Sequence, residues 1–124
     1  MPGIATLAMV NIDCDDPRAL ADFYHRVLGW EIAHSQDEYA MVSDGQTAIG
    51  FGRIEAYEPP NWPNTGGTKQ FHLDLYVDDL DKAELSCLEA GATKPDFQPG
   101  GDGWRVLRDP SGHPFCLCPR PQEQ

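Results

Sequence analysis

Two stretches of the chain alternate apolar and polar side chains with a period of two, which predicts β-strands. In residues 9–16 the apolar face carries Val10, Ile12 and Cys14, and in residues 72–79 it carries Leu73, Leu75 and Val77. The opposite faces carry Met9, Asn11 and Asp13 in the first stretch and His72, Asp74 and Tyr76 in the second. One common shift maps the first stretch onto the second, which indicates an internal repeat.

A helix is predicted after each of these strands, because a capping aspartate precedes an apolar stripe. The first helix follows Asp16, has Pro17 at its first position and ends at Gly29. The second follows Asp79 and ends at Gly91. The stripes consist of Leu20, Phe23, Tyr24, Val27 and Leu28 in the first helix and of Leu80, Ala83, Leu85 and Leu88 in the second.

The pattern returns to strands after each helix. The predicted ranges are 30–33, 39–43 and 47–54 in the first half and 104–108 and 115–118 in the second. A further strand is predicted at 92–95, where the sequence pattern is weaker. Asp44-Gly45 predicts a hairpin turn, and residues 109–112 predict another turn. Residues 57–68 are rich in Pro and Gly and are predicted to be a connector without regular structure.

These elements predict an α+β fold in which two βαβββ modules form a curved, partly open mixed sheet around a central pocket. We expect one domain over residues 1–124, with the first module at about 4–56, the connector at 57–68 and the second module at about 69–119. The polar faces of the two repeated strands would line the pocket, with Met9 and His72 as equivalent occupants related by a pseudo-twofold axis.

Charge and composition narrow the classes of partner. The 124 residues include 20 acidic and nine basic side chains, and the formal net charge of −11 argues against nucleic acid as a partner. No apolar run approaches the roughly 20 residues that cross a bilayer, so we expect no membrane partner and a cytoplasmic location. The four cysteines form no C-x-x-C motif and are expected to be reduced thiols.

Several motifs in a fixed order carry a resemblance to a known superfamily. They are the run from Asp16 through Phe23-Tyr24 to Leu28-Gly29-Trp30, then Phe71-His72-Leu-Asp-Leu75, Gly91-Ala92 and Asp109-Pro-Ser-Gly112-x-Pro-Phe115-Cys116. Over nearly its whole length the chain resembles the vicinal oxygen chelate superfamily, which includes glyoxalases, bleomycin resistance proteins and dioxygenases. The resemblance implies the glyoxalase/bleomycin-resistance fold.

The resemblance also implies where a metal would bind. Enzymes of the superfamily hold one divalent metal through a residue on the first strand and a residue on the last strand of each half. In this chain His72 matches that pattern, but the other places hold Met9, Gly50 or Gly52, and Cys116. Two ligands are too few for a catalytic site, although Asp13 or Asp74 lie nearby on the same faces. We therefore expect no cofactor, and under an alternative hypothesis a divalent Zn, Ni, Fe or Mn ion with His72 as a ligand.

Other pocket residues have competing interpretations. His72 either binds a metal or hydrogen-bonds Asp74, and the second is favoured. Cys116 and Cys118 share a strand face and are interpreted as a small apolar wall rather than as nucleophiles. Trp62 and Trp104 either stack on a planar or cationic ligand, or they anchor loops or form a dimer contact. The predicted ligand pocket therefore comprises Met9, Asn11, Asp13, Trp62, His72, Asp74, Tyr76, Trp104, Cys116 and Cys118.

The first hypothesis for function is a binding protein of the bleomycin-resistance type that sequesters a small aromatic or cationic compound without a catalytic metal. The alternative is a metal-dependent lyase, isomerase or dioxygenase acting on a substrate with vicinal oxygens. A regulatory or structural module without a ligand is a third possibility. The resemblance further implies a homodimer. Whether the protein is an enzyme stays open at this point.

Overall fold

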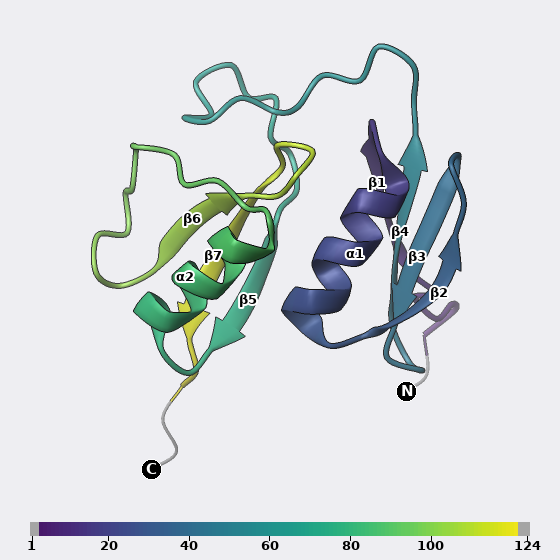
Figure 1. Ribbon diagram of the computed structural model, residues 1–124, viewed down its shortest axis with the longest axis horizontal. Helices are drawn as coiled ribbons and strands as arrows, with labels where there is room; N and C mark the ends of the chain where they lie inside the picture. Colours follow the sequence, from purple (N-terminus) through teal and green to yellow (C-terminus); the bar gives the residue numbers. More distant parts are fainter. Residues whose placement is uncertain (1–2, 122–124) are drawn as a thin grey trace. The chain divides into compact units, whose positions relative to one another are not determined.

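The computed structural model describes residues 3–121 (Figure 1). The chain divides into two compact units, with the boundary in the sequence between Glu58 and Pro59. The first unit contains β1 (Val10–Cys14), α1 (Pro17–Leu28), β2 (Glu31–Ser35), β3 (Tyr39–Ser43) and β4 (Ala48–Arg53). The second contains β5 (Leu73–Val77), α2 (Leu80–Ala90), β6 (Arg105–Arg108) and β7 (Pro114–Pro119). The predicted α+β class and the repeated strand-to-helix order are confirmed.

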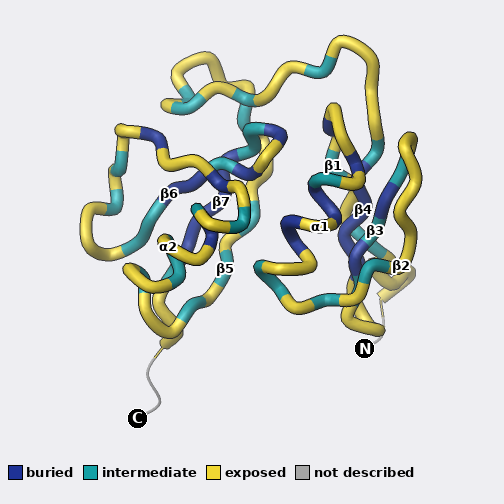
Figure 2. Tube along the Cα trace, viewed as in Figure 1, coloured by how far each residue is buried: buried dark blue, intermediate teal, exposed yellow. Residues whose placement is uncertain are grey.

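The first unit is a four-stranded sheet in the order β1-β4-β3-β2, with α1 packed against β2, β3 and β4. β1 runs parallel to β4, and the other pairs are antiparallel. The core lies between α1 and the sheet, where Tyr24 stacks on Phe51 with 5.5 Å between ring centroids and Phe23 meets Tyr24 edge-on. Leu20 is fully buried as well. Figure 2 shows buried segments in α1, β3 and β4.

The second unit is a three-stranded sheet in the order β5-β7-β6, with α2 packed against β6 and β7. β5 is parallel to β7, and β6 is antiparallel to β7. The strand predicted at 92–95 is reduced to a single antiparallel bridge between Thr93 and Arg108. Pro95 explains the difference, because its backbone nitrogen has no hydrogen to donate to a strand ladder. The second module is thus one regular strand short of the predicted βαβββ order.

Both helices begin and end where the sequence predicts. The Asp16 carboxylate accepts a hydrogen bond from the Ala19 amide at 3.2 Å, and the Asp79 carboxylate accepts one from the Lys82 amide at 3.1 Å. Gly29 closes α1 with φ +73° and Gly91 closes α2 with φ +121°, conformations that glycine adopts without steric cost. Each strand therefore leads into its helix through a capping aspartate.

The predicted alternation along the repeated strands holds in β5, where Leu73, Leu75 and Val77 are half-buried and Asp74 and Tyr76 are exposed. β1 follows it less closely, because Val10 on the expected apolar face is 43% exposed. The predicted joining of the two sheets around one pocket, with Met9 and His72 as its equivalent occupants, stays a prediction. No helix within residues 3–121 is long and apolar enough to span a bilayer.

Candidate functional site

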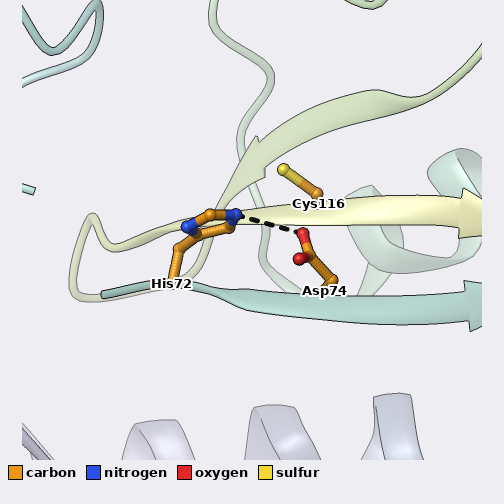
Figure 3. A group of neighbouring side chains, drawn as sticks. All are labelled: His72, Asp74 and Cys116. Atoms are coloured by element: carbon orange, nitrogen blue, oxygen red, sulfur yellow. Dashed lines mark ion pairs between the residues drawn. The ribbon is translucent and has the colours of Figure 1, made fainter. Parts of the chain in front are cut away.

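Polar side chains gather on one face of the β5–β7 pair. The parallel register places Asp74 opposite Cys116 and Tyr76 opposite Cys118, and His72 precedes β5 directly. His72 Nε2 lies 3.1 Å from Asp74 Oδ1 (Figure 3). Ligating atoms of His72, Asp74 and Cys116 all lie within 4.8 Å of one another. His72 and Asp74 are therefore neighbours, as the favoured sequence interpretation requires, and the hydrogen bond between them stays a prediction.

A hollow of about 400 Å³ opens at this face, within the size range of roughly 300–1,000 Å³ that small-molecule pockets occupy. Most of the predicted pocket residues line it together. They are Trp62, His72, Asp74, Trp104, Cys116 and Cys118. Lys69, Gly103 and Pro119 complete the lining and were not anticipated from the sequence. All of these residues belong to the second unit.

Trp62 joins the connector to the rest of the second unit. Its Nε1–H donates to the Phe97 carbonyl at 3.0 Å, and its ring lies 5.8 Å from the Phe97 ring. The Lys69 ammonium lies 5.0 Å from the centroid of the Trp62 ring, within the range of cation–π attraction. Trp62 therefore anchors a loop while it also lines the hollow, so the two interpretations of this residue are compatible.

Trp104 rests on a glycine. A Cβ atom at Gly100 would collide with the Cγ, Cδ2 and Cε2 atoms of the Trp104 indole, so only glycine permits the ring to lie there. The sequence signal for this contact is the Gly-rich loop that precedes Trp104. Gly100 thus positions one aromatic wall of the hollow.

Both thiols in the hollow are held in the protonated form. Burial raises the pKa of Cys116 to about 11, and the nearby Asp74 carboxylate adds to the rise through its charge and a hydrogen bond. Burial and Asp74 also raise the pKa of Cys118. A thiol is a weak nucleophile when its thiolate is this disfavoured. The geometry therefore agrees with the interpretation of these cysteines as wall residues.

The remaining predicted pocket residues lie elsewhere. Tyr76 is 60% exposed and does not line the hollow. Met9, Asn11 and Asp13 belong to the first unit. There the Tyr39 hydroxyl donates to the Met9 sulfur at 3.5 Å. These residues stay predicted members of the pocket.

The metal expected from the alternative hypothesis can be tested against the donor atoms. The sequence indicated His72 and Cys116 as ligands in the second module, with Asp74 as a possible carboxylate. The structure brings all three together, and a nitrogen, oxygen and sulfur set suits Zn²⁺. The Cys116 thiol would have to lose its proton to bind a metal, against its raised pKa. These residues therefore fit a three-ligand site confined to one module.

The first module offers no equivalent set at the positions that the superfamily uses. A Cβ at Gly50 would collide with Asn11 Oδ1 and the Tyr39 hydroxyl, so the space where a longer ligand would start is already filled. Met9 presents a thioether that accepts from Tyr39. A four-ligand site drawn from both modules does not fit these residues.

The fold repeats a strand-to-helix module, and the second module carries a hollow on its strand face. Residues 9–118 match the family model described as Glyoxalase-like domain, and the chain belongs to this family. No curated protein matches the sequence. The chain has the glyoxalase/bleomycin-resistance fold, as the matching solved structures do.

One similar structure is a glyoxalase/bleomycin resistance protein/dioxygenase family enzyme from Burkholderia phytofirmans PsJN, with 27% identity, a TM-score of 0.66 and coverage of 93% of this chain and 98% of that chain. The bleomycin resistance determinant encoded on transposon Tn5 has 20% identity, a TM-score of 0.58 and coverage of 95% and 100%. The fosfomycin resistance protein FosX from Listeria monocytogenes has 14% identity, a TM-score of 0.67 and coverage of 96% of each chain. The last two similarities concern the fold.

Proposed function

We propose that this protein binds a small planar aromatic compound, without a catalytic metal, in the hollow lined by Trp62 and Trp104. The observation that carries the proposal is that two indoles and a close His72–Asp74 pair, with 3.1 Å between Nε2 and Oδ1, line one hollow of about 400 Å³. Apolar surface with a few placed polar groups is typical of sites for small organic ligands. The bleomycin and fosfomycin resistance proteins of the same fold give this proposal its functional precedent.

The charges at the hollow favour an aromatic ligand over a cationic one. Lys69 already occupies one face of Trp62 and would repel a second cation there. Among the described residues, the lining of the hollow holds one acidic residue, Asp74, and one basic residue, Lys69, so the formal net charge of −11 is not concentrated at this site. An uncharged ring that stacks on an indole meets neither of these obstacles.

His72 and Asp74 would give the site its polar specificity. His72 Nε2 lies 3.1 Å from Asp74 Oδ1, and the imidazole Nδ1 is a second nitrogen that can hydrogen-bond a ligand. The second Asp74 oxygen is also an acceptor, and 60% of the Asp74 side chain is exposed. A planar ligand with a hydroxyl or amine donor would satisfy these atoms.

Binding can be measured by thermal shift and by tryptophan fluorescence against a panel of planar aromatic compounds. We expect Trp104→Ala to weaken the binding of a hit by about three- to tenfold, the value of one aromatic contact. Gly100→Ala should weaken it as well, because the added Cβ displaces the Trp104 ring. Trp30→Phe, in the first unit, is the matched control and should leave the affinity unchanged. Equal affinities in all four proteins would contradict the proposal.

A metal-dependent lyase, isomerase or dioxygenase is the second candidate, and the cluster of His72, Asp74 and Cys116 favours it. A metal bound there would act as a Lewis acid on the vicinal oxygens of a substrate. Elemental analysis of the purified protein decides between the candidates. One equivalent of a divalent metal that is lost in His72→Ala, together with turnover of a dicarbonyl adduct or a catechol, would replace the binding proposal by this one.

We also propose that the protein works as a cytoplasmic homodimer. Large apolar side chains are exposed in the single chain, among them Ile4, Leu7 and Phe71, and association of two copies would remove such surface from water. Light scattering coupled to gel filtration measures the mass directly. A monomer at all concentrations tested would exclude the dimer without affecting the ligand proposal.

A further inference from the structure

The second unit contains another hollow, of about 620 Å³, between the connector and the turn that follows β6. The connector lines it with Pro59, Pro60, Trp62 and Pro63, and the end of β6 and the following turn line it with Arg108 and Pro110. It is separate from the hollow that holds His72, and Trp62 is the residue that contributes to both. Its chemistry differs from that of the first hollow because its cation is an arginine.

Arg108, the last residue of β6, is a half-buried cation. Its Nη2 donates to the Trp62 carbonyl at 2.8 Å, and no carboxylate among residues 3–121 forms an ion pair with it. Arg105 on the same strand makes the opposite arrangement, with ion pairs of 3.0 Å to both Asp81 and Glu84. The guanidinium of Arg108 therefore keeps donor capacity for an anion.

The acidic residue beside Arg108, Asp109, also lines the hollow, and its carboxylate is turned toward the 109–113 turn. The Asp109 side chain is fully buried and accepts hydrogen bonds from the Ser111 and His113 amides at 2.9 and 3.0 Å. Its other oxygen lies 2.9 Å from His113 Nδ1. The carboxylate is thus committed to the turn, and Arg108 is the cationic side chain that faces the hollow.

The walls of the hollow are stiff and apolar. Pro59, Pro60, Pro63 and Pro110 have fixed φ angles, and Trp62 adds a flat surface. The connector approaches the turn so closely that a Cβ at Gly112 would lie 2.7 Å from Pro59 Cβ, and Gly112 has φ +87°. A site whose walls are fixed before binding loses little conformational entropy when a ligand enters.

We propose that this hollow is a second ligand site that takes a small organic carboxylate, paired with the Arg108 guanidinium and seated with its apolar body against the prolines and Trp62. Arginine matches a carboxylate with parallel hydrogen bonds, and such charge-assisted bonds are stronger than neutral ones. This proposal does not depend on what the His72 hollow binds.

Benzoate is the probe, and benzamide is its uncharged isostere. Each is titrated into the ¹⁵N-labelled protein at neutral pH and about 0.15 M salt, which limits long-range repulsion by the acidic chain. We expect benzoate to shift the Arg108 Nε–H and Trp62 Nε1–H resonances while Trp104 stays in place, and benzamide to bind at least about tenfold more weakly. Arg108→Gln should weaken benzoate binding to a similar extent. Arg120→Gln is the matched control, because Arg120 is an exposed arginine of the same unit that pairs with Asp78.

Several outcomes would overturn the proposal. These are an absence of benzoate binding at millimolar concentration, equal binding of benzamide, equal losses in Arg108→Gln and Arg120→Gln, or shifts confined to Trp104. If Arg108→Gln loses the amide dispersion of a folded protein, the comparison of benzoate with benzamide on the unaltered protein decides the question. Inorganic phosphate is the third ligand to be titrated. If phosphate binds as tightly as benzoate, the apolar walls do not contribute to binding.

Discussion

Asp74 on β5 stands directly opposite Cys116 on β7, and its carboxylate is hydrogen-bonded to the Cys116 thiol. Two consequences follow from this pair. The carboxylate raises the pKa of the thiol, in addition to the larger effect of burial, and it brings an oxygen ligand next to a sulfur ligand and an imidazole. The same residue thus suppresses thiol chemistry and completes the candidate metal donor set.

Asp74→Asn should lower the pKa of Cys116 from about 11, because the change removes a neighbouring negative charge. At pH 8 about one thiol in a thousand is ionised when the pKa is about 11, so the thiolate fraction should increase in the variant. The measurement is the pH midpoint of iodoacetamide labelling at Cys116, followed by peptide mass spectrometry. Asp13→Asn, in the first unit, is the control. A midpoint that stays or rises in Asp74→Asn would show that Asp74 does not stabilise the thiol form.

The ion pair between Arg105 on β6 and Glu84 on α2 should make stability depend on pH. Burial raises the pKa of Glu84, but hydrogen bonds from Arg105 and Lys94 outweigh it and hold the pKa below the ordinary 4.5. Because the pKa is lower in the folded protein, the pair contributes stability above pH 4.5 that is lost as the pH falls through the folded pKa. We expect Arg105→Gln to lower the free energy of unfolding by about 1–3 kcal/mol at pH 7 and by less in acid.

The control for Arg105→Gln is Arg53→Gln. Arg53 pairs with Glu38 at the same 3.0 Å, but their side chains are 48% and 75% exposed, against 13% and 17% for Arg105 and Glu84. Exposed pairs contribute about 0–1 kcal/mol, so Arg53→Gln should change the free energy of unfolding little. Urea unfolding at pH 7 and at pH 4 measures both variants. Similar losses in the two would mean that burial does not set the strength of these pairs.

The two capping aspartates should contribute similar free energies, because they hold equivalent places in the repeat. Asp16→Ala and Asp79→Ala each remove an acceptor for an amide in the first turn of a helix, and each should cost about 1 kcal/mol of unfolding free energy. Asp22→Ala, on the exposed side of α1, is the control and should cost less, since alanine favours a helix interior. Chemical denaturation measures all three variants, and a cap variant that loses no more unfolding free energy than Asp22→Ala would contradict the prediction.

Gly50 and Gly52 on β4 offer a matched pair of substitutions. A Cβ at Gly50 meets Asn11 and the Tyr39 hydroxyl, whereas a Cβ at Gly52 meets nothing within 4 Å. We expect Gly50→Ala to shift the Asn11 side-chain amide resonances and to cost about 1–2 kcal/mol of unfolding free energy, while Gly52→Ala stays near neutral. An unmoved Asn11 amide in Gly50→Ala would contradict the crowding at this position.

Most of the fold could be predicted because the signals are local. The range of β3 was predicted to the residue, and both helices begin after their capping aspartates and end before their glycines. The prediction of a regular strand at 92–95 was wrong. Thr93 forms a single backbone bridge there, and Pro95 has no N–H with which to extend a ladder of hydrogen bonds. The boundaries of the other strands differ by one or two residues, as expected where pairing partners decide the ends.

The candidate site was only partly accessible to such reasoning. Period-two alternation placed His72 and Asp74 on one face, and the motif pattern pointed to Cys116. Neither pattern indicated that Lys69 lies over Trp62, that Gly100 lies against Trp104 or that a hollow surrounds Arg108. These contacts join residues whose spacing follows no periodic rule.

The sequence by itself determined the repeated strand-to-helix plan, the capped helices and the family, because each depends on side-chain order over a few neighbouring positions. Only the tertiary structure decided that Asp74 meets Cys116 and that Trp62 lines two hollows. Strand register and loop path bring these groups together, and both are set by packing between distant segments that leaves no periodic trace in the order of residues.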